Sequence, residues 1–291
     1  MESEQINTAL SKLNGFKENK MRLKYPVFFV PGWTDEICSV WKEPYGGKQC
    51  IKQWLSEVAI NPDLAQYIPF IEETSRCKNF LDFGEVLKNK IWQSIGKNQM
   101  FDLVGHSMGG LDIRAAITQG VDPLLNCRYC ITVATPNCGD NFGGIQNFFA
   151  KHFRRLMQAI KNMPSHQIEQ GKYLDPDYPP IKQLNSLENR KLFLRNVSKL
   201  YELKGTEDFL VQGSAFIDKT GMESLFKEKV TAIPIDGCEH VGVKGITLDP
   251  RTIAVIIYVL CGIDLKLQLA MNYGTLKGGY YKPINEKDRF V

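Results

Sequence analysis

The stretch of sequence that decides the fold spans residues 101–111 and reads FDLVGHSMGGL. Its first part, residues 101–104, is typical of a buried strand, and its last part has the pattern of a helix. Between them stands a G-x-S-x-G motif centred on Ser107. A turn this tight between a strand and a helix leaves no room for neighbouring side chains, and Gly105 and Gly109 remove that clash. The stretch therefore predicts that Ser107 projects from a sharp strand-to-helix turn.

This turn would give Ser107 the surroundings of a nucleophile. The first N–H groups of a helix have no partner within the helix, and the positive end of the helix dipole lies there. The N–H of Met108 is therefore expected to point to where an oxyanion would form beside the serine. G-x-S-x-G is common by chance, but a strand before it and a helix after it supply the structural context that the motif needs.

Working outward, further apolar runs of strand length occur along the chain. They are continuous and rich in β-branched and aromatic residues, which is typical of strands covered on both faces. Together with the run before Ser107 they predict strands at about 27–30, 67–71, 101–104, 130–134, 200–203 and 230–235.

Helical patterns separate most of these runs. Asp249 followed by Pro250 is a helix start, with a capping side chain and then proline in the first turn, and Gly262 is a suitable stop. Apolar residues recur at three- or four-residue steps before the strand at 101, at Phe83, Val86, Leu87, Ile91 and Ile95. Strands that alternate with helices predict an α/β fold, with a mostly parallel sheet of about six strands and helices on both faces.

The alternation breaks between residues 135 and 192, and we interpret residues 141–191 as an insertion within a single domain of residues 1–291. The insertion carries eight Lys/Arg and four Asp/Glu. Residues 145–160 follow a strong amphipathic helix pattern. The apolar face of that helix could belong to a mobile lid that contacts a lipid interface, or to a fixed cap that packs on the core, and the sequence leaves both readings open.

Several stretches together resemble the α/β-hydrolase superfamily, of the serine lipase/esterase type. The resemblance runs from residue 26 to about residue 262. It rests on VFFVPGW (27–33), GHSMGG (105–110), VATPNCG (133–139), GTEDFLV (205–211) and GCEHVG (237–242). Their order places serine, acid and histidine in the sequence that the superfamily uses.

The resemblance implies a catalytic triad of Ser107, His240 and Asp208. His240 follows the last predicted strand and would take the proton from Ser107, while Asp208 would orient the imidazole. The residues alone leave four rivals for the acid, which are Glu202, Glu207, Asp236 and Glu239, and the resemblance favours Asp208. The remaining histidines are poor candidates for the base, because His106 belongs to the turn itself and neither His152 nor His166 follows a strand.

The expected oxyanion hole consists of the backbone N–H groups of Trp33 and Met108. Many members of the superfamily carry His-Gly where this chain has Pro31-Gly32. Because backbone groups make the hole, this departure need not disable it.

These features lead us to expect a carboxylic ester hydrolase that acts on esters or lipids with medium to long acyl chains and needs no metal or cofactor. The alternatives are an acyltransferase or acyl thioesterase with the same triad, since the fold does not fix the acceptor. A non-catalytic relative that serves as a binding module is a further alternative, but it would be expected to have a broken triad.

Composition excludes some functions and leaves others open. A net charge of +4 over 291 residues is too weak to predict nucleic-acid binding. Residues 1–24 lack the apolar core of a signal peptide, and the apolar run at 253–261 is too short to span a bilayer. We expect a cytoplasmic protein, with secretion after signal removal as the alternative. The lone CxxC at Cys127 and Cys130 is read as a pair of buried thiols.

Overall fold

The computed structural model of the chain describes residues 2–33, 35, 38–73, 75–120, 122–139, 173–208, 211, 216, 229–263, 276–277 and 280–281. Within them, a six-stranded sheet has the order β2-β1-β3-β4-β5-β6, and all neighbouring strands are parallel. The strands are β1 (Val27–Val30), β2 (Ala65–Tyr67), β3 (Phe101–His106), β4 (Cys127–Val133), β5 (Val197–Gly205) and β6 (Val230–Ile235). The expected parallel sheet is thus confirmed.

One predicted strand lies earlier than expected. The sequence predicted a strand at about 67–71, whereas β2 ends at Tyr67. Ile68 still donates its N–H to Phe29 O at 3.0 Å. The next residue is Pro69, which has no N–H to donate and so ends the ladder.

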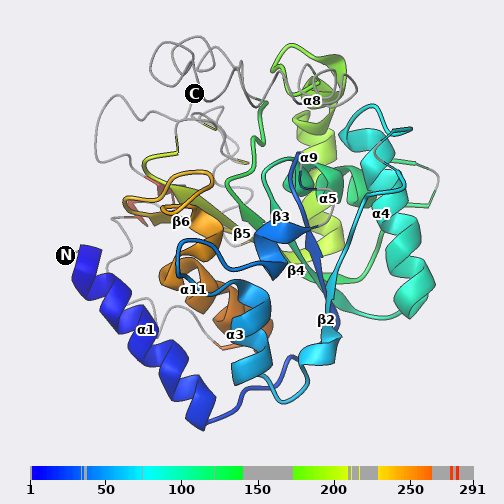
Figure 1. Cartoon of the computed structure of the whole chain (residues 1–291). Coiled ribbons are helices and arrows are strands. Elements are labelled where there is room, and N and C mark those ends of the chain that lie inside the picture. Colours follow the sequence, from blue (N-terminus) through cyan, green and yellow to red (C-terminus); the bar gives the residue numbers. More distant parts are fainter. Residues whose placement is uncertain are drawn as a thin grey trace.

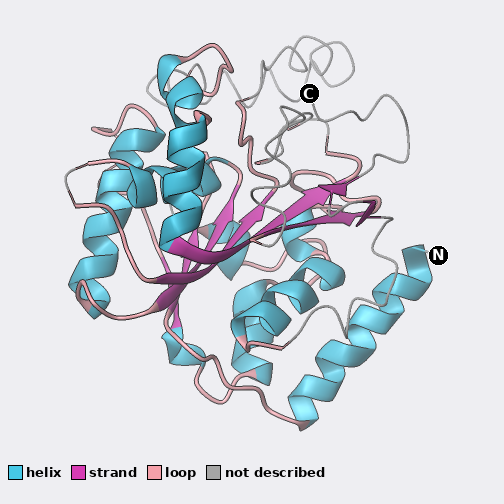
Figure 2. Ribbon diagram, turned by 180° about the vertical axis from the view of Figure 1, so that it is seen from behind, coloured by secondary structure: helices cyan, strands magenta, loops and turns pink. Residues whose placement is uncertain are grey.

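Helices cover both faces of the sheet (Figures 1 and 2). On one face α3 and α11 pack against the strands and α1 lies outside them, while α4, α5, α8 and α9 cover the other face. Their bounds are α1 (Glu2–Glu18), α2 (Ser39–Lys42), α3 (Ile51–Val58), α4 (Phe80–Ile95), α5 (Met108–Thr118), α8 (Pro179–Leu184), α9 (Leu187–Asn196) and α11 (Pro250–Leu260), with 3₁₀ turns at Pro62–Leu64 and Ile246–Leu248.

The alternation of side chains along β1 explains the two cores. Val27 and Phe29 belong to the core on the α3 and α11 side, and Phe28 and Val30 belong to the core on the α4 and α5 side. Successive side chains of a strand point to opposite faces, so a strand buried on both faces must be apolar throughout.

α11 begins with the cap that the sequence predicts, and α4 begins with a side-chain cap that was not predicted. The Asn79 side chain accepts the N–H of Leu81 at the start of α4, and Asp249 Oδ1 accepts the N–H of Arg251 at the start of α11, at 2.8 and 2.9 Å. α11 ends before Gly262, which has the positive φ of 72° expected of a helix stop.

The first helix was not expected from the sequence. α1 is mostly polar, but it buries Ala9 and Leu13, and the Phe16 ring meets the Tyr258 ring edge-on at 5.0 Å. A narrow apolar stripe therefore fixes this helix on α11 (Figure 1). None of the helices in the described part of the chain is long and apolar enough to cross a bilayer.

Most of the predicted insertion, with its helix at 145–160, lies outside the described residues. Its last part, from residue 173 onward, contains α8 and the beginning of α9, which pack on the α5 side of the sheet. Near residue 280 a short antiparallel pair, β7 (Leu276–Lys277) and β8 (Tyr280–Tyr281), is also described.

All eight cysteines lie in the described residues and are free thiols. Cys127 and Cys130 are buried in the core on the α4 and α5 side, where burial raises the pKa of both thiols. Their surroundings agree with the interpretation of this pair as core residues.

Candidate active site

The site lies at the carboxyl edge of the sheet, where the chain changes direction. After β1 the chain passes to β2 on one side, and it then returns to form β3 on the other side of β1. The loops that follow β1 and β3 therefore leave the sheet in opposite directions, and ligands of open α/β sheets bind at such a switch point. Ser107 stands directly after β3 in this position.

The backbone of Ser107 is strained in the manner expected of an exposed nucleophile. Its φ and ψ are 52° and −128°, a conformation that is uncommon for a residue with a side chain. Its N–H donates to Val133 O at 2.9 Å, so β4 holds the turn. A Cβ at Gly109 would collide with the Pro31 carbonyl, and one at Gly105 would lie 2.8 Å from Gly110 N. The two glycines of the motif are thus required by close backbone packing.

Three side chains meet at this edge. His240 Nε2 lies 2.9 Å from Ser107 Oγ, and His240 Nδ1 lies 2.9 Å from Asp208 Oδ2. An ionised carboxylate can only accept a hydrogen bond, so Nδ1 is the donor to Asp208. In a neutral imidazole Nε2 is then an acceptor, and the Ser107 hydroxyl donates to it. This arrangement can pass a proton from the serine to the histidine.

The loop after β6 holds His240 through its backbone. Glu239 N–H donates to Lys244 O at 2.9 Å, and Gly245 N–H donates to Gly242 O at 2.9 Å. His106 Nε2 lies 3.3 Å from the His240 carbonyl oxygen. Burial, reinforced by the nearby His240, holds the pKa of His106 well below its usual range. A neutral His106 can therefore support the His240 backbone without adding a charge beside it.

Asp208 is fixed on both carboxylate oxygens. Oδ2 faces His240, and Oδ1 accepts the N–H of Val211 at 3.0 Å. The side chain is fully buried, whereas 9% of the His240 side chain is exposed. A buried carboxylate that is hydrogen-bonded in this way can hold one orientation of the imidazole.

The four rival acids make other contacts. Glu202 lies inside β5 and accepts from Asn137 and Phe216, and the Glu207 carboxylate pairs with Lys244 at 3.3 Å. The backbone carbonyl of Asp236 accepts from Arg251, and the backbone of Glu239 forms the turn next to His240. Of the five candidates, Asp208 is the one that the structure brings to His240.

The loop after β1 comes close to Ser107. A Cβ at Gly32 would lie 2.7 Å from Ser107 Cβ, so the backbone passes directly beside the serine. Trp33 follows Gly32 and is partly buried against the core on the α4 and α5 side, while Met108 is the first residue of α5. Both residues thus flank Ser107, and their roles as oxyanion donors stay predictions. His152 and His166 lie outside the described residues.

Comparison with solved structures identifies the fold. The mature form of Bacillus licheniformis lipase BlEst2 matches 82% of this chain and 92% of its own chain, with a TM-score of 0.53 and 17% identity. Legionella pneumophila phospholipase PlaB, in complex with thio-NAD, matches 81% of this chain with a TM-score of 0.54 and 15% identity, and this chain spans 58% of PlaB. At these identities the likeness shows the α/β-hydrolase fold. No protein-family model and no curated protein matches the sequence.

Proposed function

We propose that the protein is a serine hydrolase that cleaves carboxylic esters through an acyl-enzyme on Ser107. The observation that carries this proposal is the unbroken chain of contacts from Ser107 Oγ through His240 to Asp208, at 2.9 Å for each step. The fold shared with a lipase and a phospholipase adds support.

In the proposed reaction, Ser107 Oγ attacks the ester carbonyl carbon while its proton passes to His240 Nε2. The C–O bond to the alcohol then breaks, and the departing alcohol takes that proton from His240. Water attacks the acyl-enzyme in the same way and gives one proton to His240. The Ser107 ester bond then breaks, the acid leaves, and the proton returns to Ser107. Throughout, Asp208 holds the imidazole and stabilises its charged form.

The oxyanion of each tetrahedral intermediate would be held by the N–H groups of Met108 and Trp33. The position of Met108 at the first turn of α5 supports its role as a donor, because its N–H has no acceptor within the helix. The close approach of Gly32 to Ser107 supports the role of Trp33, because it brings the loop that carries Trp33 to the nucleophile.

As substrates we propose esters with medium or long acyl chains. A series of p-nitrophenyl esters of increasing chain length tests this, and activity limited to the acetate would contradict it. Assays with alcohol acceptors and with acyl thioesters separate hydrolysis of esters from acyl transfer and from thioester hydrolysis.

The central claim is tested by labelling with a fluorophosphonate probe, which forms a covalent bond to an activated serine. The wild-type protein is expected to be labelled at Ser107, and Ser107→Ala is expected to be unlabelled and to lose ester hydrolysis by at least about 10⁴-fold. Folding of the variant is checked by its unfolding curve. A wild-type protein that labels no more than Ser107→Ala would refute the proposal.

A further inference from the structure

A buried polar network lies within the sheet beside the candidate active site. At its centre is Glu202, which is on β5 between its register partners Thr132 and Ala232. Its Oε1 accepts two hydrogen bonds, from Asn137 Nδ2 at 2.6 Å and from the backbone N–H of Phe216 at 2.8 Å. The carboxylate thus joins two segments that follow different strands.

The first segment is the loop that follows β4. Asn137 is 1% exposed, and its backbone carbonyl accepts from Arg114 Nη1 and from Asn185 Nδ2, both at 2.8 Å. Arg114 is on α5 and also donates to Leu184 O at 2.7 Å. This loop is therefore fixed to α5 and to the end of α8, and it gives Glu202 a rigid partner.

The second segment is the one that follows Asp208. Phe216 is fully buried, and its ring lies 5.3 Å from the Phe193 ring. The guanidinium groups of Arg114 and Arg190 lie over the Phe216 ring at 4.9 and 5.9 Å. Contacts of a cation with an aromatic face are strengthened by burial. The chain is therefore firmly held where its N–H meets Glu202.

Asp208 lies between these two fixed points. The chain leaves β5 after Gly205 and reaches Asp208. Further along, the N–H of Phe216 donates to Glu202, which is back on β5. Between them, the N–H of Val211 binds Asp208 Oδ1 at 3.0 Å. Glu202 thus closes the base of the loop that carries Asp208, and closing a loop restricts the conformations that it can adopt.

We infer that Glu202 is a positioning residue, which holds the Asp208 loop against the loop after β4 and thereby keeps Asp208 in place for His240. This inference rests on the proposed function. It assigns Glu202 no contact with substrate or with the reacting atoms. The functional consequence is that Glu202 acts on turnover through the orientation of Asp208, and has little influence on substrate binding.

Burying the Glu202 carboxylate has a cost in folding free energy, and this cost supports a role other than stability. Burial raises the pKa of the Glu202 carboxyl to about 7, although Phe216 N–H, Arg114, Asn137 and Lys204 each favour its charged form. A buried charge of this kind is seldom a better choice for stability than an apolar side chain in the same strand. The hydrogen bonds at its Oε1 are what an apolar residue could not supply.

The test compares three variants of the full chain. Glu202→Met keeps the length of the side chain but removes the acceptor, and Glu202→Gln restores an oxygen that can accept both hydrogen bonds. Glu207→Gln is the matched control, because Glu207 is on the same loop but its carboxylate is exposed and pairs with Lys244. For each variant, kcat and KM for a p-nitrophenyl ester are measured, together with hydrogen exchange of the 203–216 segment.

We expect Glu202→Met to lower kcat by about 10- to 100-fold with KM changed less than about threefold, because small displacements of catalytic groups have effects of this size. Exchange in the 203–216 segment is expected to rise, with the rest of the sheet unchanged. Glu202→Gln is expected to recover most of both losses relative to Glu202→Met, and Glu207→Gln to match the wild type.

Wild-type exchange in the 203–216 segment of Glu202→Met would overturn the inference, and so would equal losses of kcat in Glu202→Met and Glu202→Gln. Should Glu202→Met fail to fold, Asn137→Ala removes one of the two donors to Oε1 and is expected to increase exchange in the same segment. A wild-type protein that the fluorophosphonate does not label would refute the proposed function, while the exchange measurement still decides the role of Glu202.

Discussion

Two buried aspartates lie at opposite ends of the strands of the same sheet, one at the carboxyl ends and one at the amino ends. Each is paired with a nitrogen donor. At the carboxyl edge, Asp208 contacts His240. At the amino edge, Asp102 on β3 binds Arg128 on β4, with Nε donating to Oδ1 at 2.9 Å and Nη2 donating to Oδ2. The two pairs look alike in composition, but they differ in what surrounds them.

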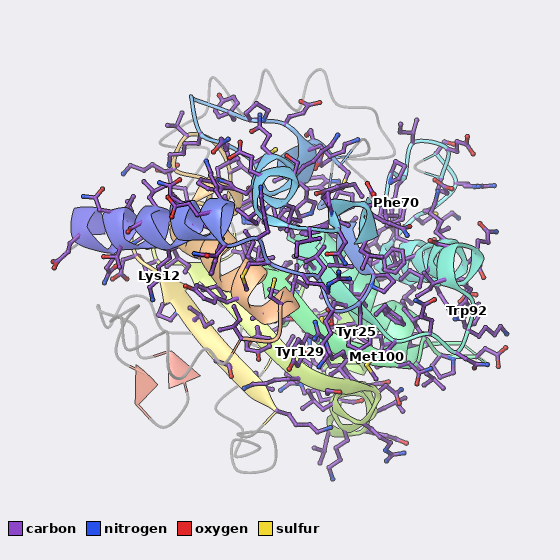
Figure 3. The ribbon with its side chains drawn as sticks, turned by 90° about the horizontal axis from the view of Figure 1, so that it is seen from below. Lys12, Tyr25, Phe70, Trp92, Met100 and Tyr129 are labelled. Carbon is purple, nitrogen blue, oxygen red and sulfur yellow. The ribbon has the colours of Figure 1, made fainter. Side chains whose placement is uncertain are left out.

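Both members of the pair at the amino edge have further partners. Asp102 Oδ1 also accepts the N–H of Tyr129, and Arg128 Nη2 also donates to Leu260 O at the end of α11. The guanidinium lies 4.8 Å from the Tyr25 ring and 4.3 Å from the Tyr129 ring, which are labelled in the view from below (Figure 3). A permanent cation with these partners joins β3, β4 and α11.

The pair at the carboxyl edge is open on one side. His240 carries a titratable ring whose second nitrogen faces Ser107, which is partly exposed. The backbone there is also strained, since Ser107 and Ala134, which directly follow β3 and β4, have φ values of 52° and 51°. Backbone strain is a cost that a purely structural pair would avoid. The comparison assigns the candidate active site to the carboxyl edge and a structural ion pair to the amino edge.

The largest expected effect that separates the two edges comes from Asp208→Asn. An amide in this position would favour the wrong tautomer of His240, and we expect kcat to fall by about 10⁴-fold. The free energy of unfolding is expected to change far less than the activation free energy. Ester hydrolysis and denaturant unfolding of the same preparation measure both, and a loss of activity below about tenfold would contradict the role of Asp208.

Asp102→Asn makes the same change in the pair at the amino edge. Removing the negative charge leaves Arg128 buried without its counter-charge, which typically costs about 3–5 kcal/mol of unfolding free energy. The kcat of the folded fraction is expected to stay within about threefold of wild type, because the site lies at the other edge. Equilibrium unfolding in urea measures the loss of unfolding free energy. Active-site titration gives the concentration of folded enzyme, from which kcat is calculated.

The double variant Asp102→Asn, Arg128→Met serves as the control for Asp102→Asn. It removes the unpaired cation and is expected to recover part of the lost stability. If Asp102→Asn is as stable as wild type, or if the double variant is less stable than Asp102→Asn, the pair is not the structural contact inferred from its geometry.

A third effect concerns the pH dependence of stability, and it separates Glu202 from the Asp208–His240 pair at the same edge. The Glu202 pKa is raised from an ordinary 4.5 to about 7 in the fold. Between these values the folded state binds more protons than the unfolded state, so this group's contribution to stability is present below about pH 4.5 and is lost as pH rises to about 7. The difference amounts to roughly 3 kcal/mol.

Unfolding free energies of wild type and Glu202→Gln at pH 5 and pH 8 check this prediction. Other groups titrate in both proteins and cancel in the comparison. Wild type is expected to lose stability relative to Glu202→Gln as the pH rises, and parallel curves for the two proteins would contradict the buried, proton-binding state of Glu202.

The features of the fold and of the candidate site that could be predicted from sequence are those that depend on patterns of neighbouring residues. The G-x-S-x-G turn around Ser107 follows from steric limits within a few residues, and the apolar runs give the strands. His240 follows a strand, and the carboxyl ends of parallel strands meet at one edge, so its approach to Ser107 follows from topology. The choice of Asp208 among the candidate acids came from the resemblance to the α/β-hydrolase superfamily.

The parts that could not be predicted depend on contacts between distant positions. Glu202, Asn137 and Phe216 form one network, but each alone is a single residue in an ordinary strand or loop. One signal was Arg114, which with Asp112 is one of two charged residues in the mostly apolar α5, since a buried guanidinium requires partners. The first helix was missed because Ala9, Leu13 and Phe16 form too narrow an apolar stripe within a polar sequence.

The smallest expected effect comes from Glu207→Gln, which compares two adjacent residues, Glu207 and Asp208. Glu207 and Asp208 are neighbours in the same loop, but the Glu207 carboxylate pairs with Lys244 at 3.3 Å with both side chains more than half exposed. Exposed pairs of this kind contribute less than about 1 kcal/mol. We therefore expect activity within about threefold of wild type and a change in unfolding free energy of about 0.5 kcal/mol or less. Loss of activity in Glu207→Gln, with activity retained in Asp208→Asn, would transfer the acid role to Glu207, because orientation of His240 requires a carboxylate that is held against its Nδ1.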